Sequence, residues 1–243
     1  MKILPDSIKN GYLRLMNPIA DFLVRRRVHP NTITIWGTVI YIAGGAVYAT
    51  GHISIGGWLL GLTALTDVLD GMVARRSNTS SQFGAFLDST LDRVADGFTM
   101  GGLAVFFAFS PVHRSPTMVA VCITGLIGAF LTSYTRARAE SLGLDAKVGM
   151  LQRPERVVLL SAPQAFFGLA LNGWVLTIII YILAITAWIT VVQRILYVYR
   201  ATQPQREAVP ELDSGSDSEP SEYRQWGRRS RRETAVRPAL KGE

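Results

Sequence analysis

The sequence has little charge and a single cysteine. Only 18% of its 243 residues are charged, whereas 49% are hydrophobic, and the mean hydropathy is +0.24. This composition is more apolar than that of an ordinary soluble domain and argues against a soluble single-domain enzyme. The lone Cys122 excludes an intramolecular disulfide framework and a multi-cysteine metal site. Because it lies in an apolar stretch, we expect it to be a packing residue.

Long uncharged stretches fill the middle of the chain. The first, 32–50, has no charge over 19 residues, which is enough for a helix to cross a hydrocarbon core of about 30 Å. Five further apolar segments follow, separated by short polar or Gly/Pro-containing joints: 55–76, 84–110, 116–138, 154–172 and 174–199. The sequence therefore predicts an all-α integral membrane protein with six transmembrane helices.

The basic residues are distributed unevenly between the joints. If the joints are assigned alternately to the two sides, 24 of the 25 lysines and arginines fall on one side and only Arg114 falls on the other. The positive-inside rule then predicts a multi-pass protein of the cell membrane with both termini in the cytoplasm. No cleavable signal is expected, because 1–27 has neither a continuous apolar core nor a small-residue cleavage site.

The two ends of the chain differ from the apolar body, 28–200. In 1–27, apolar residues recur at helical spacing opposite a basic face, which predicts an amphipathic interfacial helix with a break at Pro18. A helix packed on the cytoplasmic ends of the spans is the alternative. The segment 201–243 is rich in Pro, Ser, Glu and Asp, so we expect a disordered cytoplasmic tail, whose basic cluster is either solvated or in contact with anionic lipid.

Acidic residues are rare in the body and lie close together. The range 28–139 contains only five acidic residues: Asp67, Asp70, Asp88, Asp92 and Asp96. The first two are three residues apart and the last three recur every four residues, so each set shares one helix face. Ionised carboxylates in a membrane are unfavourable unless cations compensate them. Their oxygens suit Mg²⁺, Mn²⁺ or Ca²⁺, and two close divalent ions suit phosphoryl chemistry.

Small residues and an arginine stand between these acids. The pattern reads Asp67-x-x-Asp70-Gly71-x-x-Ala74-Arg75, then eight residues, then Gly84-x-x-x-Asp88-x-x-x-Asp92. The glycines and the alanine let a ligand approach the helix backbone, and the arginine offers a planar fork for phosphate oxygens.

This pattern matches every fixed position of the signature D-xx-D-G-xx-A-R-x8-G-xxx-D-xxx-D, so the chain resembles the CDP-alcohol phosphatidyltransferases over about residues 1–200. The resemblance implies a six-helix membrane bundle, a homodimer, and a site open to the cytoplasm between the second and third spans. It implies two divalent metal ions, with Mg²⁺ expected and Mn²⁺ as the alternative, held by Asp67, Asp70, Asp88 and Asp92. By the same resemblance Asp92 is also the general base. Asp96 lies outside the signature, and we expect it to support the ligands or to pair with Arg93.

The resemblance also implies where CDP-diacylglycerol binds, at the turn into the first span and at the small residues of the motif. The matching positions are Asn31, Thr32, Ile33, Thr34, Gly71, Arg75, Ser81 and Gly84. Asn31 and Thr32 also have a structural reason to be present, because they are suited to cap the first span, whose N-terminus favours phosphate.

Arginines gather again around the joint between the fourth and fifth spans. The stretches S-Y-T-R-A-R-A-E at 133–140 and R-P-E-R at 153–156 flank this joint. Membrane anchoring explains some of these arginines, whereas several forks converging on one pocket favour a dianionic phosphate. The two stretches resemble those of actinobacterial phosphatidylinositol phosphate synthases. That resemblance implies that the acceptor phosphate binds Arg136, Arg138, Arg156 and Arg194.

The expected reaction is transfer of a phosphatidyl group from CDP-diacylglycerol to inositol 1-phosphate, which releases CMP. Glycerol 3-phosphate fits the same arginines nearly as well and would give phosphatidylglycerol phosphate. A cation transporter is the alternative from another class, because intramembrane acids also mark ion paths. Arg75 and the placement of the acids at one membrane face argue against it, and a scaffold role leaves the five acids unexplained. Membrane lipid is an expected partner and nucleic acid is not.

Overall fold

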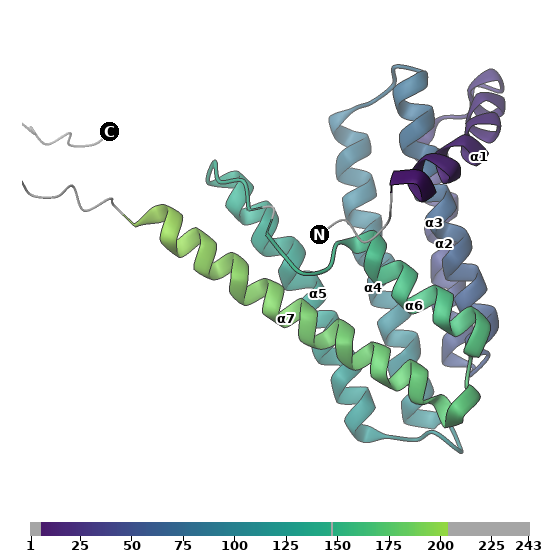
Figure 1. The fold of residues 1–243 in the computed structure, drawn as a ribbon, viewed down its shortest axis with the longest axis vertical. Helices are drawn as coiled ribbons and strands as arrows, with labels where there is room; N and C mark the ends of the chain where they lie inside the picture. The colour runs from purple at the N-terminus through teal and green to yellow at the C-terminus, as the bar shows by residue number, and fades with distance from the viewer. Residues whose placement is uncertain (1–5, 147, 204–243) are drawn as a thin grey trace, which may run out of the picture. The chain divides into compact units, whose positions relative to one another are not determined.

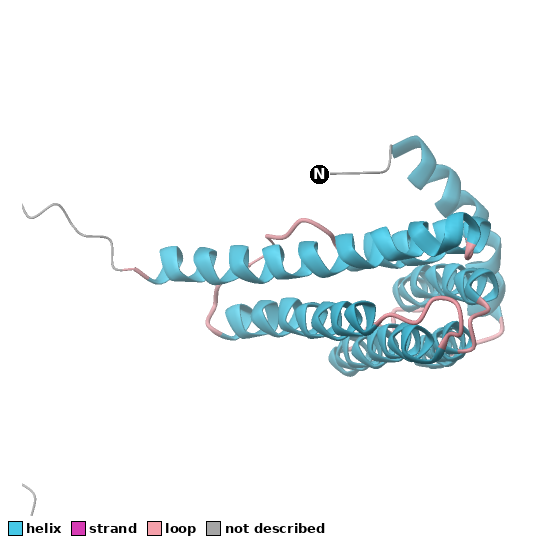
Figure 2. Cartoon of the chain, turned by 90° about the horizontal axis from the view of Figure 1, so that it is seen from below, coloured by secondary structure: helices cyan, strands magenta, loops and turns pink. Residues whose placement is uncertain are grey.

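The structure is a computed structural model that describes residues 6–146 and 148–203. These residues form seven α-helices and one short 3-10 turn, and they contain no strand (Figures 1 and 2). The helices are α1 (Asp6–Arg25), α2 (Pro30–Ala49), α3 (Ile53–Arg76), α4 (Gln82–Phe109), α5 (Pro116–Ser141), α6 (Arg153–Phe167) and α7 (Trp174–Thr202), with the turn η1 at Ala170–Gly173. The predicted tail, 201–243, lies almost entirely outside the described residues.

The six predicted apolar segments correspond to α2 through α7, which confirms the all-α prediction. Four described stretches are long and apolar enough to cross a membrane: α2, α3, α5, and η1 together with α7. The other two helices fall short for different reasons. α4 has four charged residues among its first 15 residues, and α6 has only 15 residues in all.

Two details of the predicted segments are wrong. The fifth segment was expected to reach residue 172, but α6 ends at Phe167 and the chain turns at Gly168. Leu171 and Asn172 both have positive φ, of 54° and 55°, so a right-handed helix does not continue through them. The break expected at Pro18 is also absent, because α1 runs without interruption from Asp6 to Arg25.

The helices α2 to α7 pack in a closed ring, in which each helix contacts two others. α2 contacts both α3 and α4, α3 contacts α6, α4 contacts α5, and α7 joins α5 to α6. The hydroxyl of buried Tyr48 on α2 donates to the carbonyl of Leu160 on α6 at 2.8 Å. A Cβ added at Gly102 of α4 would collide with the backbone of Gly45 of α2, so these two helices are in direct backbone contact. Cys122 is fully buried in this core, as expected.

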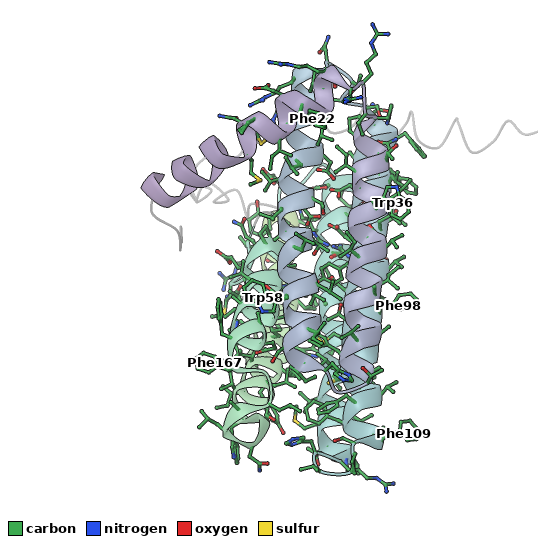
Figure 3. All side chains as sticks on the ribbon, turned by 90° about the vertical axis from the view of Figure 1, so that its right-hand side faces the viewer. Phe22, Trp36, Trp58, Phe98, Phe109 and Phe167 are labelled. Carbon is green, nitrogen blue, oxygen red and sulfur yellow. The ribbon has the colours of Figure 1, made fainter. Side chains whose placement is uncertain are left out.

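The outer surface of the ring is rich in large apolar side chains. Trp36, Trp58, Phe98 and Phe109 point outward from the helices (Figure 3), and all four are at least half exposed. An extended apolar surface of this kind suits contact with lipid rather than with water. These exposed aromatic side chains lie on α2, α3 and α4, whereas the charged side chain of Asp70 on α3 is buried.

α1 packs against the end of α3. Met16 and Ala20 are buried in a small cluster with Leu69, Met72 and Val73 of α3. Arg76 at the end of α3 pairs with Asp21 at 2.5 Å, and it also donates to Asn17. These contacts fix α1 close to the turn after α3, where the acidic motif lies.

Candidate active site

The acidic motif lies on two helices that flank α2. Asp67 and Asp70 lie in the last three turns of α3, and Asp88, Asp92 and Asp96 lie within the first 15 residues of α4. Ser81 caps α4 by accepting a hydrogen bond from the amide of Gly84 at 3.0 Å. This cap begins α4 immediately after the turn and brings its acids back alongside those of α3.

Asp70 is the most buried of the motif acids. Its residue exposure is 9%, and its Oδ2 accepts a hydrogen bond of 2.7 Å from the hydroxyl of Thr34 on α2. The sequence motif does not contain Thr34. α2 therefore contributes directly to the orientation of an acid on α3.

A pocket beside Asp70 brings together much of the predicted CDP-lipid set. Its lining includes five of the predicted residues together with two motif acids: Asn31, Thr34, Gly71, Ser81, Gly84, Asp70 and Asp88. A Cβ added at Gly84 would meet Asn31 Oδ1 and Ser81 Oγ, each at 3.2 Å, so the missing side chain keeps this pocket open. Arg75 lies alongside, 3.2 Å from the position that a Cβ on Gly71 would take.

Two residues of that set lie elsewhere. Thr32 is exposed and is not part of the pocket lining, and Ile33 packs against the α1–α3 cluster. The capping role expected of Asn31 and Thr32 is also wrong. His29 caps α2, because its ring nitrogen accepts from the amide of Asn31 at 3.2 Å. The preceding histidine gave no capping signal, since histidine is not among the preferred N-cap residues.

Arg153 at the start of α6 lies between the two acidic helices. Its Nη1 is 2.7 Å from Asp67 Oδ2, and its Nη2 is 2.8 Å from Asp92 Oδ1. In the sequence, Arg153 belongs to the basic stretch at the joint, but nothing in that stretch predicts a contact with the acids. Its pairing with the acids depends on the packing of α6 against α3, which cannot be predicted from the local sequence.

Arg93 pairs with the acids on its own helix. Its guanidinium lies 3.6 Å from Asp92 and 3.9 Å from Asp96, which confirms the expected pairing of Asp96 with Arg93. Asp92 is therefore paired with two arginines, Arg93 and Arg153.

The carboxylates offer only oxygen donors, which are the ligands that Mg²⁺ and Mn²⁺ prefer. Within the described part of the chain, no three acidic, histidine or cysteine side chains form a ready ligand set. Arg153 instead bridges two of the acids. The donor chemistry therefore fits divalent ions, and the guanidinium holds the oxygens that such ions would use.

Two of the four predicted acceptor arginines converge on one residue. Arg156 donates to the hydroxyl of buried Thr132 at 3.3 and 3.4 Å, and Arg194 donates to the carbonyl of the same residue. The Nε of Arg156 is buried without a hydrogen-bond partner, and the residues Arg156 and Asp96 both line a small cavity. A buried donor without a partner is suited to an anionic ligand.

The other two acceptor candidates lie at the exposed end of α5. Arg136 forms an ion pair of 2.9 Å with Glu140, one turn along the same helix. Arg138 is exposed, and its described contact is a hydrogen bond of 3.4 Å to Ser141. The structure thus joins Arg156 to Arg194 and leaves Arg138 in local contacts.

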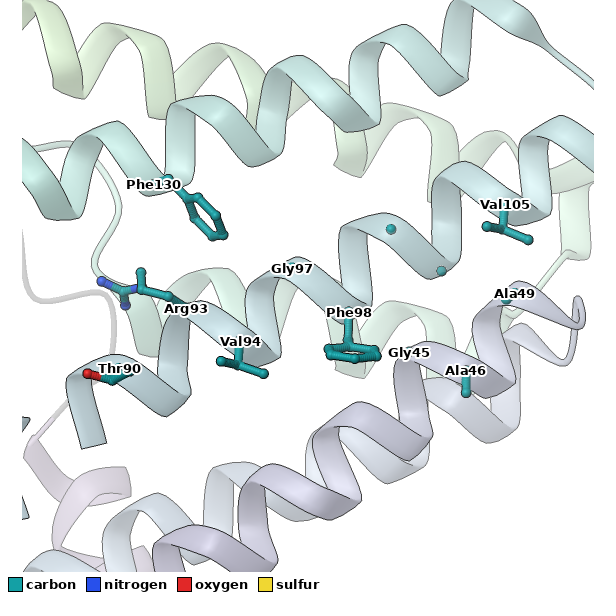
Figure 4. Close-up of a pocket in the computed structure, with 12 residues that line it drawn as sticks. Gly45, Ala46, Ala49, Thr90, Arg93, Val94, Gly97, Phe98, Val105 and Phe130 are labelled. Carbon is teal, nitrogen blue, oxygen red and sulfur yellow. The ribbon is translucent and has the colours of Figure 1, made fainter. Parts of the chain in front are cut away.

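An apolar groove runs along the outer face between α2, α4 and α5 (Figure 4). Gly45 and Ala46 of α2, Val94 and Phe98 of α4, and Phe130 of α5 line it. Arg93 is the one charged residue of its lining. This groove shares no lining residue with the pocket beside Asp70 and is therefore separate from the polar site.

Comparison with known proteins places these features in context. A model of the CDP-alcohol phosphatidyltransferase family matches residues 27–200. A phosphatidylinositol phosphate synthase from Mycobacteroides abscessus is 36% identical over 211 residues, which cover 86% of this chain and 94% of that protein. The Mycobacterium tuberculosis phosphatidylinositol phosphate synthase, solved with CDP-DAG bound, aligns with a TM-score of 0.70 at 33% identity, covering 76% of this chain and 94% of that one. Its structure in complex with manganese and citrate aligns with a TM-score of 0.68 at 33% identity, covering 75% and 88%.

Proposed function

The chain belongs to the CDP-alcohol phosphatidyltransferase family, and we propose that it transfers the phosphatidyl group of CDP-diacylglycerol to inositol 1-phosphate. The products are phosphatidylinositol phosphate and CMP. The observation that supports this acceptor most directly is the placement of two arginines in the first turn of α6. Arg153 there reaches the acids, and Arg156, one turn later, reaches Thr132 beside Arg194. An alcohol that carries a phosphate fits this arrangement, with its phosphate on the arginine pair and a hydroxyl toward the acids.

Asp92 is assigned as the general base that removes the proton from the acceptor hydroxyl. Asp92 is on the face of α4 that Arg153 approaches, and its side chain is only 15% exposed. The acceptor oxygen forms a new bond to the β-phosphorus of CDP-diacylglycerol while the bond from that phosphorus to the CMP oxygen breaks. Asp92 takes the hydroxyl proton in this step, as a general base must.

Divalent metal use is supported by the oxygen donors and by the manganese bound in the M. tuberculosis homologue. We assign Asp67, Asp70, Asp88 and Asp92 as the residues that would hold two divalent ions, Mg²⁺ first and Mn²⁺ as the alternative. Such ions would neutralise the diphosphate and the charge that develops on the leaving group. Thr34 keeps Asp70 oriented through its hydrogen bond of 2.7 Å.

The pocket beside Asp70 is assigned to CDP-diacylglycerol. Asn31, Thr34, Gly71, Ser81 and Gly84 line it, and Arg75 lies next to Gly71. Thr32 and Ile33 are not assigned side-chain contacts, because they lie outside the lining.

Among the acceptor arginines, Arg156 and Arg194 form the phosphate site. Arg136 is assigned to the same site by the family resemblance, and its guanidinium pairs with Glu140 at 2.9 Å. Arg138 joins the site only if its exposed side chain turns away from Ser141.

The protein is a multi-pass membrane protein, and we assign six crossings, with α4 and α6 completing the ring around the acids. The division into a surface segment 1–27, a membrane body 28–200 and a tail 201–243 belongs to the same proposal. So do the cytoplasmic placement of both termini and a homodimer. The support for the cytoplasmic orientation is that 24 of the 25 basic residues fall on one side of these six helices.

A transfer assay tests the proposal. The purified full-length protein is incubated with CDP-diacylglycerol and, in turn, radiolabelled inositol 1-phosphate, glycerol 3-phosphate or inositol. We expect a labelled lipid with inositol 1-phosphate and a far lower rate with unphosphorylated inositol. Preference for glycerol 3-phosphate would change the acceptor, and equal use of inositol would remove the phosphate site.

A further inference from the structure

Arg153 makes an unusual double contact. Its two terminal nitrogens bind oxygens of Asp67 on α3 and Asp92 on α4, at 2.7 and 2.8 Å. One side chain from a third helix therefore connects the two helices that carry the acidic motif. The distances are those of charge-assisted hydrogen bonds.

The position of Arg153 on its own helix does not explain its presence. It is the first residue of α6, where the helix dipole disfavours a positive charge. The capping of that end is provided by Gln152 and Glu155, so Arg153 has no part in it. Its Nε is buried and has no hydrogen-bond partner. The two aspartates are thus what holds the guanidinium in place.

The same contacts conflict with metal binding. Asp92 Oδ1 is taken by Arg153 at 2.8 Å, and its Oδ2 lies 3.6 Å from Arg93. Asp67 Oδ2 is taken by Arg153 as well. A divalent ion that binds both acids needs oxygens from each, and its charge repels a guanidinium on those oxygens. Metal binding and the Arg153 bridge therefore compete.

We infer that Arg153 is a positioning residue that bridges Asp67 and Asp92 before the divalent ions bind and gives up these oxygens when they arrive. The inference rests on the proposed function, because that function assigns Asp67 and Asp92 as ligands. The bridge keeps α3, α4 and α6 in register while the acids lack other cations. Because the bridge must open before the ions bind, it lowers the apparent metal affinity of the wild type: only the fraction of molecules with free oxygens is competent to bind.

Mn²⁺ binding to the full-length protein in detergent, followed by electron paramagnetic resonance without any substrate, tests this. Arg153→Met removes the charge and keeps much of the volume. We expect it to bind Mn²⁺ about tenfold or more tightly than the wild type, because the guanidinium contacts with Asp67 and Asp92 no longer compete. Arg153→Lys retains the charge without the fork and should give an intermediate Kd. Arg114→Met is the matched control, since it removes the charge of an exposed arginine between α4 and α5 and should leave the Kd unchanged.

A second measurement separates a bridge from a permanent structural ion pair. In chelator, Arg153→Met should unfold at a lower temperature than the wild type, because Asp67 and Asp92 lose their shared cation. In saturating Mn²⁺ the difference should disappear, whereas a permanent ion pair would leave the variant destabilised in both conditions. If the methionine variant does not survive chelator, it is purified in Mn²⁺ and the comparison is made with the lysine variant.

The outcomes distinguish this inference from the proposed function. A wild-type protein that binds Mn²⁺, together with an Arg153→Met Kd that is unchanged or weaker, overturns the inference alone. A wild-type protein that binds no Mn²⁺ overturns the ligand assignment and the inference with it. If the wild type binds Mn²⁺ normally but does not transfer the phosphatidyl group to inositol 1-phosphate, only the assignment of the acceptor is overturned.

Discussion

The hydrogen bond from Thr34 to Asp70 gives the sharpest test of how α2 contributes to the metal site. The Thr34 hydroxyl donates to Asp70 Oδ2 at 2.7 Å across the interface between α2 and α3. Thr34→Val replaces the hydroxyl with a methyl group of similar size and leaves the buried carboxylate without this donor. The helix contact is preserved, so the substitution removes only the hydroxyl, with its bond to Asp70 and its longer contact of 3.2 Å to the carbonyl of Pro30 on the same helix.

The expected magnitude follows from the charge of the acceptor. A hydrogen bond to a charged group contributes about 1.5–3 kcal/mol, and about 1.4 kcal/mol corresponds to a factor of ten. Partners that orient metal ligands have effects of about ten- to a hundredfold on metal affinity. We therefore expect Thr34→Val to weaken Mn²⁺ binding by about ten- to a hundredfold, in the opposite direction to Arg153→Met.

The assay is the same substrate-free Mn²⁺ titration, because Thr34 also lines the pocket assigned to the lipid. Thr34→Ser keeps the hydroxyl and should bind Mn²⁺ nearly as well as the wild type. Thr38→Val is the matched control, since the Thr38 hydroxyl donates to the backbone carbonyl of Thr34 one turn away on the same helix. An unchanged Kd in a folded Thr34→Val protein would refute the orienting role of this hydrogen bond.

Further predictions concern the metal, the base, the acceptor and the packing. Excess chelator should abolish phosphatidyl transfer, measured as radiolabelled lipid, and Mn²⁺ or Mg²⁺ should restore it. Asp92→Asn should abolish transfer, whereas Asp96→Asn should retain substantial kcat; equal loss in two folded variants would make the base assignment untenable. Arg156→Met should raise the KM for inositol 1-phosphate about ten- to a hundredfold and change the KM for CDP-diacylglycerol far less, as steady-state kinetics would show. Gly102→Ala should lower the free energy of unfolding by about 1–3 kcal/mol because its Cβ meets the α2 backbone, whereas Gly101→Ala, with nothing within 4 Å, should not; equal melting temperatures would contradict this packing.

Several features of the fold could be read from the sequence because they are local. The length of each apolar run predicted α2 through α5 and α7, and the buried position of Cys122 followed from its apolar surroundings. The spacing of the aspartates placed each set on one helix face, since side chains three or four residues apart lie on the same side of a helix. The end of α6 was not predictable in this way, because the turn at 168–173 depends on backbone conformations that the apolar pattern does not encode.

Part of the candidate site was also predictable. The family signature contains the motif acids and the small residues around them, so the pocket beside Asp70 gathers residues that the sequence had already grouped. The missed capping role of His29 shows the limit of such grouping. A statistical preference for cap residues does not decide which side chain the local turn brings to the helix end.

What the sequence by itself determined is the set of apolar helices and the acidic faces on two of them. Only the tertiary structure decided which groups face those acids. Thr34 lies 36 residues from Asp70, and Arg153 lies 86 residues from Asp67, yet both pairs are within 2.7 Å. Arg156 and Arg194 likewise meet at Thr132 from two different helices. Periodicity sets the face that each helix buries, but the neighbour of that face is chosen by how all the helices pack together, and this choice leaves no local signal in the chain.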